Sequence, residues 1–197
     1  LQIGNGGTGG ALGGTSGVTN NGTLAFNHSD SLTHSAAISG TGSLTKNGTG
    51  ALTLSGSNSY TGGTTLNTGT LVIGNANALG TGTLTQTDGT STVSIGTTGT
   101  VSNTMSLYNV SATESATLSG SITVNNATFD VADGDTLTIS GGVGGSGGVT
   151  KNGTGTLVLE GTNSYTGNSE VNAGTLQANS AGALGNASSD IIVNGGS

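Results

Sequence analysis

The chain has 197 residues, of which 40 are glycine, and it contains no proline, cysteine or tryptophan. Its net charge of −7 arises from nine acidic residues and two lysines, Lys46 and Lys151. This excludes a nucleic-acid-binding surface, which needs many cationic side chains to neutralise phosphates. The lack of cysteine excludes a disulfide framework and a thiolate metal site, and no apolar run approaches the roughly 18 residues that span a bilayer.

Short segments that alternate apolar and polar residues predict β-strands with one buried face. Abundant threonine and valine favour strands over disorder, and clusters of glycine, asparagine, serine and aspartate supply the turns. No segment shows the helical period of 3.6 residues over ten residues. In chain order the predicted strands are Thr23–Phe26, Ser43–Thr45, Ala51–Leu54, Thr70–Ile73, Thr92–Ile95, Thr117–Val124, Thr136–Ile139, Thr156–Leu159 and Ile191–Val193.

One long segment occurs twice in the chain. Residues 44–80 and 149–185 align without a gap at an offset of 105 residues, with 22 of 37 positions identical. Weaker matches extend the internal repeat to residues 20–85 and 125–190. Because one coil of a β-solenoid takes roughly 20 residues, the offset predicts five coils of about 21 residues, with the two copies in equivalent coils.

The fold class predicted is therefore all-β, a right-handed parallel β-helix (solenoid) of about nine coils. Residues 1–197 are expected to form a single β-helix fragment of a larger protein. The strands at Leu1–Ile3 and Ile191–Val193 are expected to continue into further coils, because an uncapped terminal strand leaves unpaired backbone groups. The leucines predicted to point inward are Leu52, Leu54, Leu71, Leu157, Leu159 and Leu176.

Residues 45–71 carry a phrase that runs from Thr-Lys-Asn-Gly-Thr-Gly through Asn-Ser-Tyr-Thr-Gly to Gly-Thr-Leu. It closely resembles the passenger-associated transport repeat of autotransporter proteins, and residues 150–176 are a second copy. The second copy departs at residues 168–170, Asn-Ser-Glu, where the first has Gly-Thr-Thr at residues 63–65. Residues 18–42 are similar to the segment commonly found before this repeat.

The resemblance implies a parallel β-helix that is exported through the outer membrane by a C-terminal β-barrel. That barrel is absent from these residues, so the only expected link to a membrane lies outside them. The implied location is extracellular or on the bacterial cell surface.

Two polar motifs are candidates for ligand binding. The Asn-Ser-Tyr-Thr-Gly motif at Asn58–Gly62 and Asn163–Gly167 could be a binding turn with an exposed tyrosine, or a structural turn whose tyrosine packs on the neighbouring coil. Asp130, Asp133 and Asp135 could bind Ca²⁺ through oxygen ligands. They match no calcium loop pattern, so a solvated turn is the favoured interpretation.

Three further groups could carry catalysis. His28 and His34 could form a metal pair or a general base, but on one continuous strand they would lie about 20 Å apart, so a structural or solvent-exposed role is favoured. Glu114, Glu160 and Glu170 could pair as glycosidase carboxylates only at separations of roughly 5 to 9.5 Å. Residues 144–148 match a nucleophile elbow only as part of a glycine-rich turn.

The sequence therefore predicts no enzyme, with no catalytic residue, cofactor or metal. The favoured function is a rigid β-helical stalk that assists export and interacts at the surface, as an adhesin or by self-association. The alternative is a ligand for a host receptor or glycan, and a polysaccharide-acting enzyme is less favoured. The partner would be a host surface protein, a glycan or a second copy, and not nucleic acid.

Residues 86–120 interrupt the repeat, so any binding residues are expected there. The candidates are Met105, Tyr108 and Glu114. Ice binding through threonine ladders needs a Thr-x-Thr in every coil, and the spacing of Thr53, residues 83–85 and residues 136–138 in the sequence is too irregular for that.

Overall fold

The computed structural model describes residues 1–12, 16–186 and 190–197. Residues 187–189, at the end of the second predicted repeat, lie outside the described residues, as do residues 13–15. No helix occurs in the described part of the chain. Its strands are β1 (Gln2–Ile3), β2 (Gly17–Thr19), β3 (Thr23–Phe26), β4 (Leu32–His34), β5 (Ala37–Ser39), β6 (Ser43–Lys46), β7 (Ala51–Leu54), β8 (Thr64–Leu66), β9 (Thr70–Ile73), β10 (Leu84–Gln86), β11 (Thr92–Ile95), β12 (Thr100–Val101), β13 (Met105–Ala112), β14 (Ala116–Leu118), β15 (Ile122–Val131), β16 (Thr136–Ile139), β17 (Val143–Gly144), β18 (Val149–Asn152), β19 (Thr156–Leu159), β20 (Ser169–Val171), β21 (Thr175–Ala178) and β22 (Ile191–Val193).

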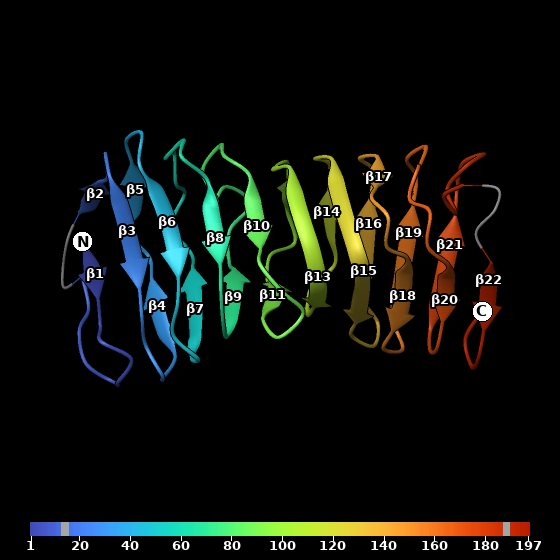
Figure 1. The fold of residues 1–197 in the computed structure, drawn as a ribbon, viewed down its shortest axis with the longest axis horizontal. Helices are drawn as coiled ribbons and strands as arrows, with labels where there is room; N and C mark the ends of the chain where they lie inside the picture. Colours follow the sequence, from blue (N-terminus) through green and yellow to red (C-terminus); the bar gives the residue numbers. More distant parts are fainter. Residues whose placement is uncertain (13–15, 187–189) are drawn as a thin grey trace.

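These strands stack into a parallel β-helix of about nine coils, as predicted. The chain ends lie at opposite ends of a rod (Figure 1). A first ladder of parallel strands runs β1-β3-β6-β8-β10-β13-β15-β17, and a second runs β4-β7-β9-β11-β13-β15-β18-β20-β22. A third runs β12-β14-β16-β19-β21, and β2 pairs β5 at the N-terminal end. Because β13 and β15 are long, each belongs to both the first and the second ladder.

The interior is filled by the inward half of each alternating strand. Along the second ladder Leu52, Leu71, Val93 and Val110 are paired in register and all are buried. Each coil thus covers the apolar side chains of its neighbours, and stability comes from nearest-neighbour stacking. Turns between strands use glycine where the chain must turn sharply. Gly69 has a φ of 72°, and a Cβ there would lie 2.6 Å from the carbonyl oxygen of Gly48.

The leucine prediction is confirmed for five of the six positions. Leu52, Leu54, Leu71, Leu157 and Leu159 are at most 1% exposed. Leu176 is half-buried and packs against the core. It lies in β21, the last strand of the third ladder, so no further strand of that ladder covers it.

Six of the nine predicted strands match the structure at both ends, and the strand predicted at Ser43–Thr45 extends one residue further. The predicted strand Thr117–Val124 is wrong. Residues 119–121 form a turn between β14 and β15 because Gly120 lies against the backbone of the preceding coil, where a Cβ would be 2.0 Å from the carbonyl oxygen of Asn103. The prediction also missed β13, whose outward side chains do not alternate cleanly between apolar and polar.

The two repeat copies do not occupy equivalent positions, which corrects the prediction of a five-coil unit. Five pairing steps along the first ladder lead from Leu44 to Val143 through Thr64, Leu84, Met105 and Ile122. The counterpart of Leu44 is Val149, six residues beyond Val143, and it lies in β18 on the second ladder. The offset of 105 residues therefore spans five coils and about one further face.

The other strands of the repeat move in the same sense. Leu52 lies on the second ladder in β7, and its counterpart Leu157 lies on the third ladder in β19. In Figure 1 β18 and β20 continue the row of β7, β9 and β11 rather than that of β6 and β8. The second copy is thus turned by one face about the rod axis, so the same outward positions of the repeat face different sides.

Unequal coil lengths cause this rotation. Most paired residues are about 20 apart in sequence, as Leu24 and Leu44 are, but Met105 pairs Ile122 only 17 residues later. The prediction assumed coils of about 21 residues throughout. A shorter coil in the middle of the rod lets five coils close before 105 residues are used.

Candidate functional site

The Asn-Ser-Tyr-Thr-Gly motif is internal structure in both copies. The Asn58 side-chain oxygen accepts a hydrogen bond from the backbone N–H of Ile38 at 2.8 Å, and its Nδ2 donates to the carbonyl of Ala78 at 2.6 Å. Asn163 makes the same two bonds, from the N–H of Val143 and to the carbonyl of Ala183. Each asparagine thereby takes the place of a strand in its ladder and joins the coil before it to the coil after it.

The tyrosine of the motif is buried, which supports the structural interpretation over an exposed binding turn. Tyr60 and Tyr165 are both 0% exposed. The Tyr60 hydroxyl lies 2.5 Å from that of Thr64, and the Tyr165 hydroxyl lies 2.6 Å from that of Ser169. The departure between the copies at residues 168–170 therefore keeps a hydroxyl partner for the tyrosine, because serine replaces threonine at the bonded position.

Burial raises the pKa of Tyr60 to about 12, although its hydrogen bond with Thr64 acts in the opposite direction. A tyrosine in an unfolded chain titrates near 10. A raised folded-state pKa means that the stabilisation is complete below pH 10 and is lost as the pH rises through 12. We expect the free energy of unfolding to fall by about 2–3 kcal/mol over this range through Tyr60. Tyr60→Phe should show a correspondingly smaller fall in urea denaturation at pH 9.5 and 11.5, and an equal fall in both proteins would contradict this.

The two lysines occupy equivalent interior positions that the sequence did not reveal. Lys46 is paired in register between Phe26 and Leu66, and it is 1% exposed. Its ammonium group donates to the carbonyl oxygens of Gly48 and Thr68, in the turns of its own coil and the next. Burial lowers the pKa of Lys46 to about 8. The surrounding carbonyls supply the partners that a buried ammonium requires.

Lys151 repeats the arrangement. It is 0% exposed, and its Nζ lies 2.5 Å from the carbonyl of Asn152, 2.7 Å from that of Gly153 and 3.4 Å from that of Ala173. Burial lowers its pKa, and the charge of Asp130 partly opposes that shift. Both lysines thus close a corner of the solenoid and face away from solvent, so neither serves as a surface cation.

The two histidines are also buried and lie on different segments. β3 ends at Phe26 and β4 begins at Leu32, so His28 and His34 do not share the continuous strand assumed from the sequence. His28 Nδ1 lies 3.1 Å from an Asp30 carboxylate oxygen. The Nε2 atoms of both histidines are buried without a hydrogen-bond partner. A structural role is supported, and the solvent-exposed alternative is wrong.

His34 interrupts an apolar column, because it is in register with Leu54, which pairs Ile73. Burial lowers the pKa of His34. A lowered folded-state pKa means that stability present above pH 6.5 is lost as the pH falls through the folded value. His34→Leu should therefore raise the free energy of unfolding by about 1–3 kcal/mol, since it removes an unsatisfied polar atom. Thermal unfolding at pH 8 and 5 should show a larger gain at pH 5; an equal gain would mean that protonation of His34 is not involved.

The acidic residues do not converge on one point. Asp135 accepts a hydrogen bond from Ser115 of the preceding coil, and Asp133 accepts one from Thr154 of the following coil, each at 3.1 Å. The three glutamates lie in separate coils, with Glu114 after β13, Glu160 after β19 and Glu170 in β20. In the described ranges no group of three or more His, Cys, Asp or Glu side chains could hold a metal ion. The acids act as links between coils rather than as a calcium or glycosidase site.

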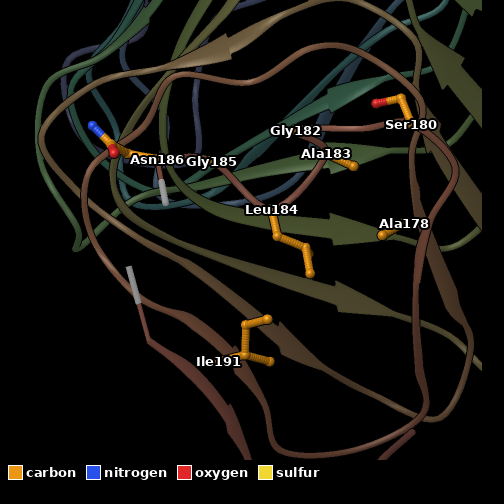
Figure 2. A pocket seen from close by; sticks show the side chains of 8 residues that line it. All are labelled: Ala178, Ser180, Gly182, Ala183, Leu184, Gly185, Asn186 and Ile191. Carbon is orange, nitrogen blue, oxygen red and sulfur yellow. The ribbon is translucent and has the colours of Figure 1, made fainter. Parts of the chain in front are cut away.

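A cavity of about 370 Å³ lies beside the last coils. Figure 2 shows it lined by residues 178–191, with the side chains of Leu184 and Ile191 at its mouth. Its only polar side chains are Ser180 and Asn186, so it offers no acid, base or nucleophile with an activating partner. Next to it Ile191, Ile192 and Val193 are exposed. The cavity is an uncovered part of the solenoid interior.

The three binding candidates have different surroundings. Met105 is 1% exposed and belongs to the core, so it cannot contact a partner. Tyr108 is half-buried and points outward from β13, and Glu114 is exposed in the turn after that strand. Among the described residues, no helix is long and apolar enough to cross a membrane.

Comparison with known proteins agrees with this architecture. The chain is a β-solenoid that carries two passenger-associated transport repeats, matched at residues 44–73 and 149–178. It is 38% identical over 123 residues to the adhesin BmaC autotransporter of Brucella suis biovar 1 (strain 1330). The aligned region covers 59% of this chain and 3% of that adhesin. No solved structure matches the chain. The predicted resemblance to autotransporter passenger regions is confirmed.

Proposed function

We propose that this chain is a segment of an autotransporter passenger displayed outside the cell, where it forms a rigid rod and takes part in adhesion without catalysis. The observation that carries the proposal is where the repeated motif places its polar groups. Asn58, Tyr60 and Lys46, together with their counterparts, direct these groups into the rod or between coils. The motif therefore builds the rod, and contacts with a partner are left to outward side chains.

The similarity to an adhesin supports a role in attachment. A rod also suits this role, because each coil extends it by about 4.8 Å and holds outward side chains at fixed intervals. A polysaccharide-acting enzyme is not favoured, since Glu114, Glu160 and Glu170 belong to separate coils.

Adhesion can be measured with beads that carry the chain. Beads coated with the 197-residue chain should attach to cultured epithelial cells more often than beads coated with albumin. Incubation of the chain with neutral and acidic polysaccharides should release no new reducing ends. Attachment equal to that of albumin would overturn the adhesive role, and turnover lost on replacing one carboxylate would overturn the absence of catalysis.

A further inference from the structure

One outward face of the rod carries hydroxyl groups in a regular array. The tripeptides 83–85, 104–106 and 121–123 each have a buried central residue, namely Leu84, Met105 and Ile122. The residues on either side of it therefore point outward. They are Thr83, Thr85, Thr104, Ser106, Ser121 and Thr123, and together they are named the hydroxyl face.

Strand pairing aligns the hydroxyl face in three successive coils of the first ladder. Thr85 pairs Ser106, and Ser106 pairs Thr123. The backbone N–H groups of Leu84 and Met105 donate to the carbonyls of Thr104 and Ser121, which places the second row in the same register. The rows are spaced about 4.8 Å along the rod and roughly 7 Å across it. Thr65 and Thr45 continue one row into two earlier coils. The regularity that sequence spacing did not reveal is produced by coils of unequal length.

These hydroxyl groups are available to a ligand. Ser106 accepts a hydrogen bond from Asn125 at 3.1 Å, whereas the other five side chains make none with the described residues. No exposed charge lies in the face-forming segments 83–87, 104–108 and 121–125. By contrast, the outward rows of the second ladder are interrupted by Val72, Asp130 and Glu170. An uncharged face on a chain of net charge −7 favours an uncharged ligand over an anionic one.

An aromatic ring adjoins this array. Among the aromatic residues, which all lie in the described ranges, Phe26, Tyr60, Phe129 and Tyr165 are at most 1% exposed, and only Tyr108 reaches solvent. Tyr108 follows Ser106 by two residues on β13, so it leaves the strand on the same side. Its ring lies over Gly89, where a Cβ would be 3.8 Å from Tyr108 Cδ1. Tyrosine combines a flat apolar surface with a polar tip, and its two side-chain torsions cost little entropy when ordered.

From this combination we infer that the hydroxyl face and Tyr108 bind a neutral polysaccharide lying along the rod. Sugar hydroxyls exchange hydrogen bonds with threonine and serine hydroxyls, which both donate and accept. The apolar face of a sugar ring packs on Tyr108. The coil spacing is of the order of one sugar unit, so successive units meet successive coils. This inference rests on the proposed adhesive function and names its ligand class.

Affinity electrophoresis of the whole chain tests the binding. Native gels contain dextran, laminarin or galactomannan as neutral probes and heparin or alginate as anionic probes. We expect at least one neutral polymer to retard the chain and neither anionic polymer to do so. Thr85→Val/Thr123→Val removes two hydroxyls with little change of shape, and it should weaken retardation about tenfold or more. Tyr108→Ala should do the same, whereas Thr117→Val/Thr138→Val on the third ladder should have no effect.

The outcomes separate this inference from the proposed function. Circular dichroism and thermal unfolding must first match the parent chain in every variant. Retardation by no neutral polymer, by anionic polymers only, or equally in all variants would overturn the inference. Hydroxyl-dependent binding to ice crystals instead would assign the face to ice. If variant-coated beads still attach to cells, adhesion stands and the polysaccharide inference fails; if parent beads do not attach but the gel shows binding, the reverse holds.

Discussion

Replacing Leu54 with aspartate should lower the free energy of unfolding by several kcal/mol, at least about 3–5. Leu54 is 0% exposed and is paired in register with His34 and Ile73 in the coils on either side. A carboxylate there would be buried with no cation opposite. Urea denaturation measures the loss. The matched control is Thr53→Asp, because Thr53 points outward from the same strand and its replacement should cost less than about 1 kcal/mol.

The location of the damage is as informative as its size. Because each coil is stabilised mainly by its neighbours, hydrogen exchange in the Leu54→Asp variant should accelerate in β4, β7 and β9. The counterpart strand β19 should keep its protection. Equal costs for Leu54→Asp and Thr53→Asp would contradict the inward orientation of Leu54. A uniform loss of protection along the rod would contradict nearest-neighbour stacking.

Asn58→Leu should have the second-largest effect, a loss of about 2–5 kcal/mol. The substitution leaves the N–H of Ile38 and the carbonyl of Ala78 without their partner, and both lie in the buried interior. An apolar side chain of similar size fills the space but cannot replace the two hydrogen bonds. Chemical denaturation should detect a comparable loss for Asn163→Leu, which breaks the equivalent bonds to Val143 and Ala183.

Two further variants isolate the cause of that loss. Asn58→Asp keeps the acceptor for Ile38 and loses the donor to Ala78, so it is also expected to destabilise the chain. Ser59→Ala changes the exposed next residue and should alter stability by less than about 0.5 kcal/mol. If Asn58→Leu were as stable as the parent chain, the asparagine would not be the link between coils that its hydrogen bonds describe.

The rotation of the second repeat affects how the rod meets its surroundings. Thr45 lies on the first ladder, whereas its counterpart Thr150 lies on the second. A partner that recognised outward residues of one repeat would meet the other on an adjacent face. The hydroxyl face instead combines residues 83–123, most of which lie outside the repeated motif. A binding surface on this rod is therefore defined by strand register rather than by the repeat.

Sequence patterns determined the local half of this structure. Alternation of apolar and polar residues located strands such as Ala51–Leu54 and Thr156–Leu159 at both ends, because a strand buried on one face imposes a period of two. The same alternation identified Leu52, Leu54 and Leu157 as core residues. The repeated phrase indicated the autotransporter passenger repeat, and it marked Asn58 and Tyr60 as structural parts. These inferences depend only on residues within one coil.

The tertiary structure alone decided what depends on register between coils. Residues six to 20 positions apart become neighbours only when every intervening coil has its actual length, and one coil of 17 residues turned the second repeat by a face. Lys46 and His34 occupy inward columns because strand pairing aligns them with Leu66 and Leu54, although their polarity predicted exposure. The alignment of Thr85, Ser106 and Thr123 has the same origin. Backbone hydrogen bonds between coils set these registers, and a local pattern carries no record of them.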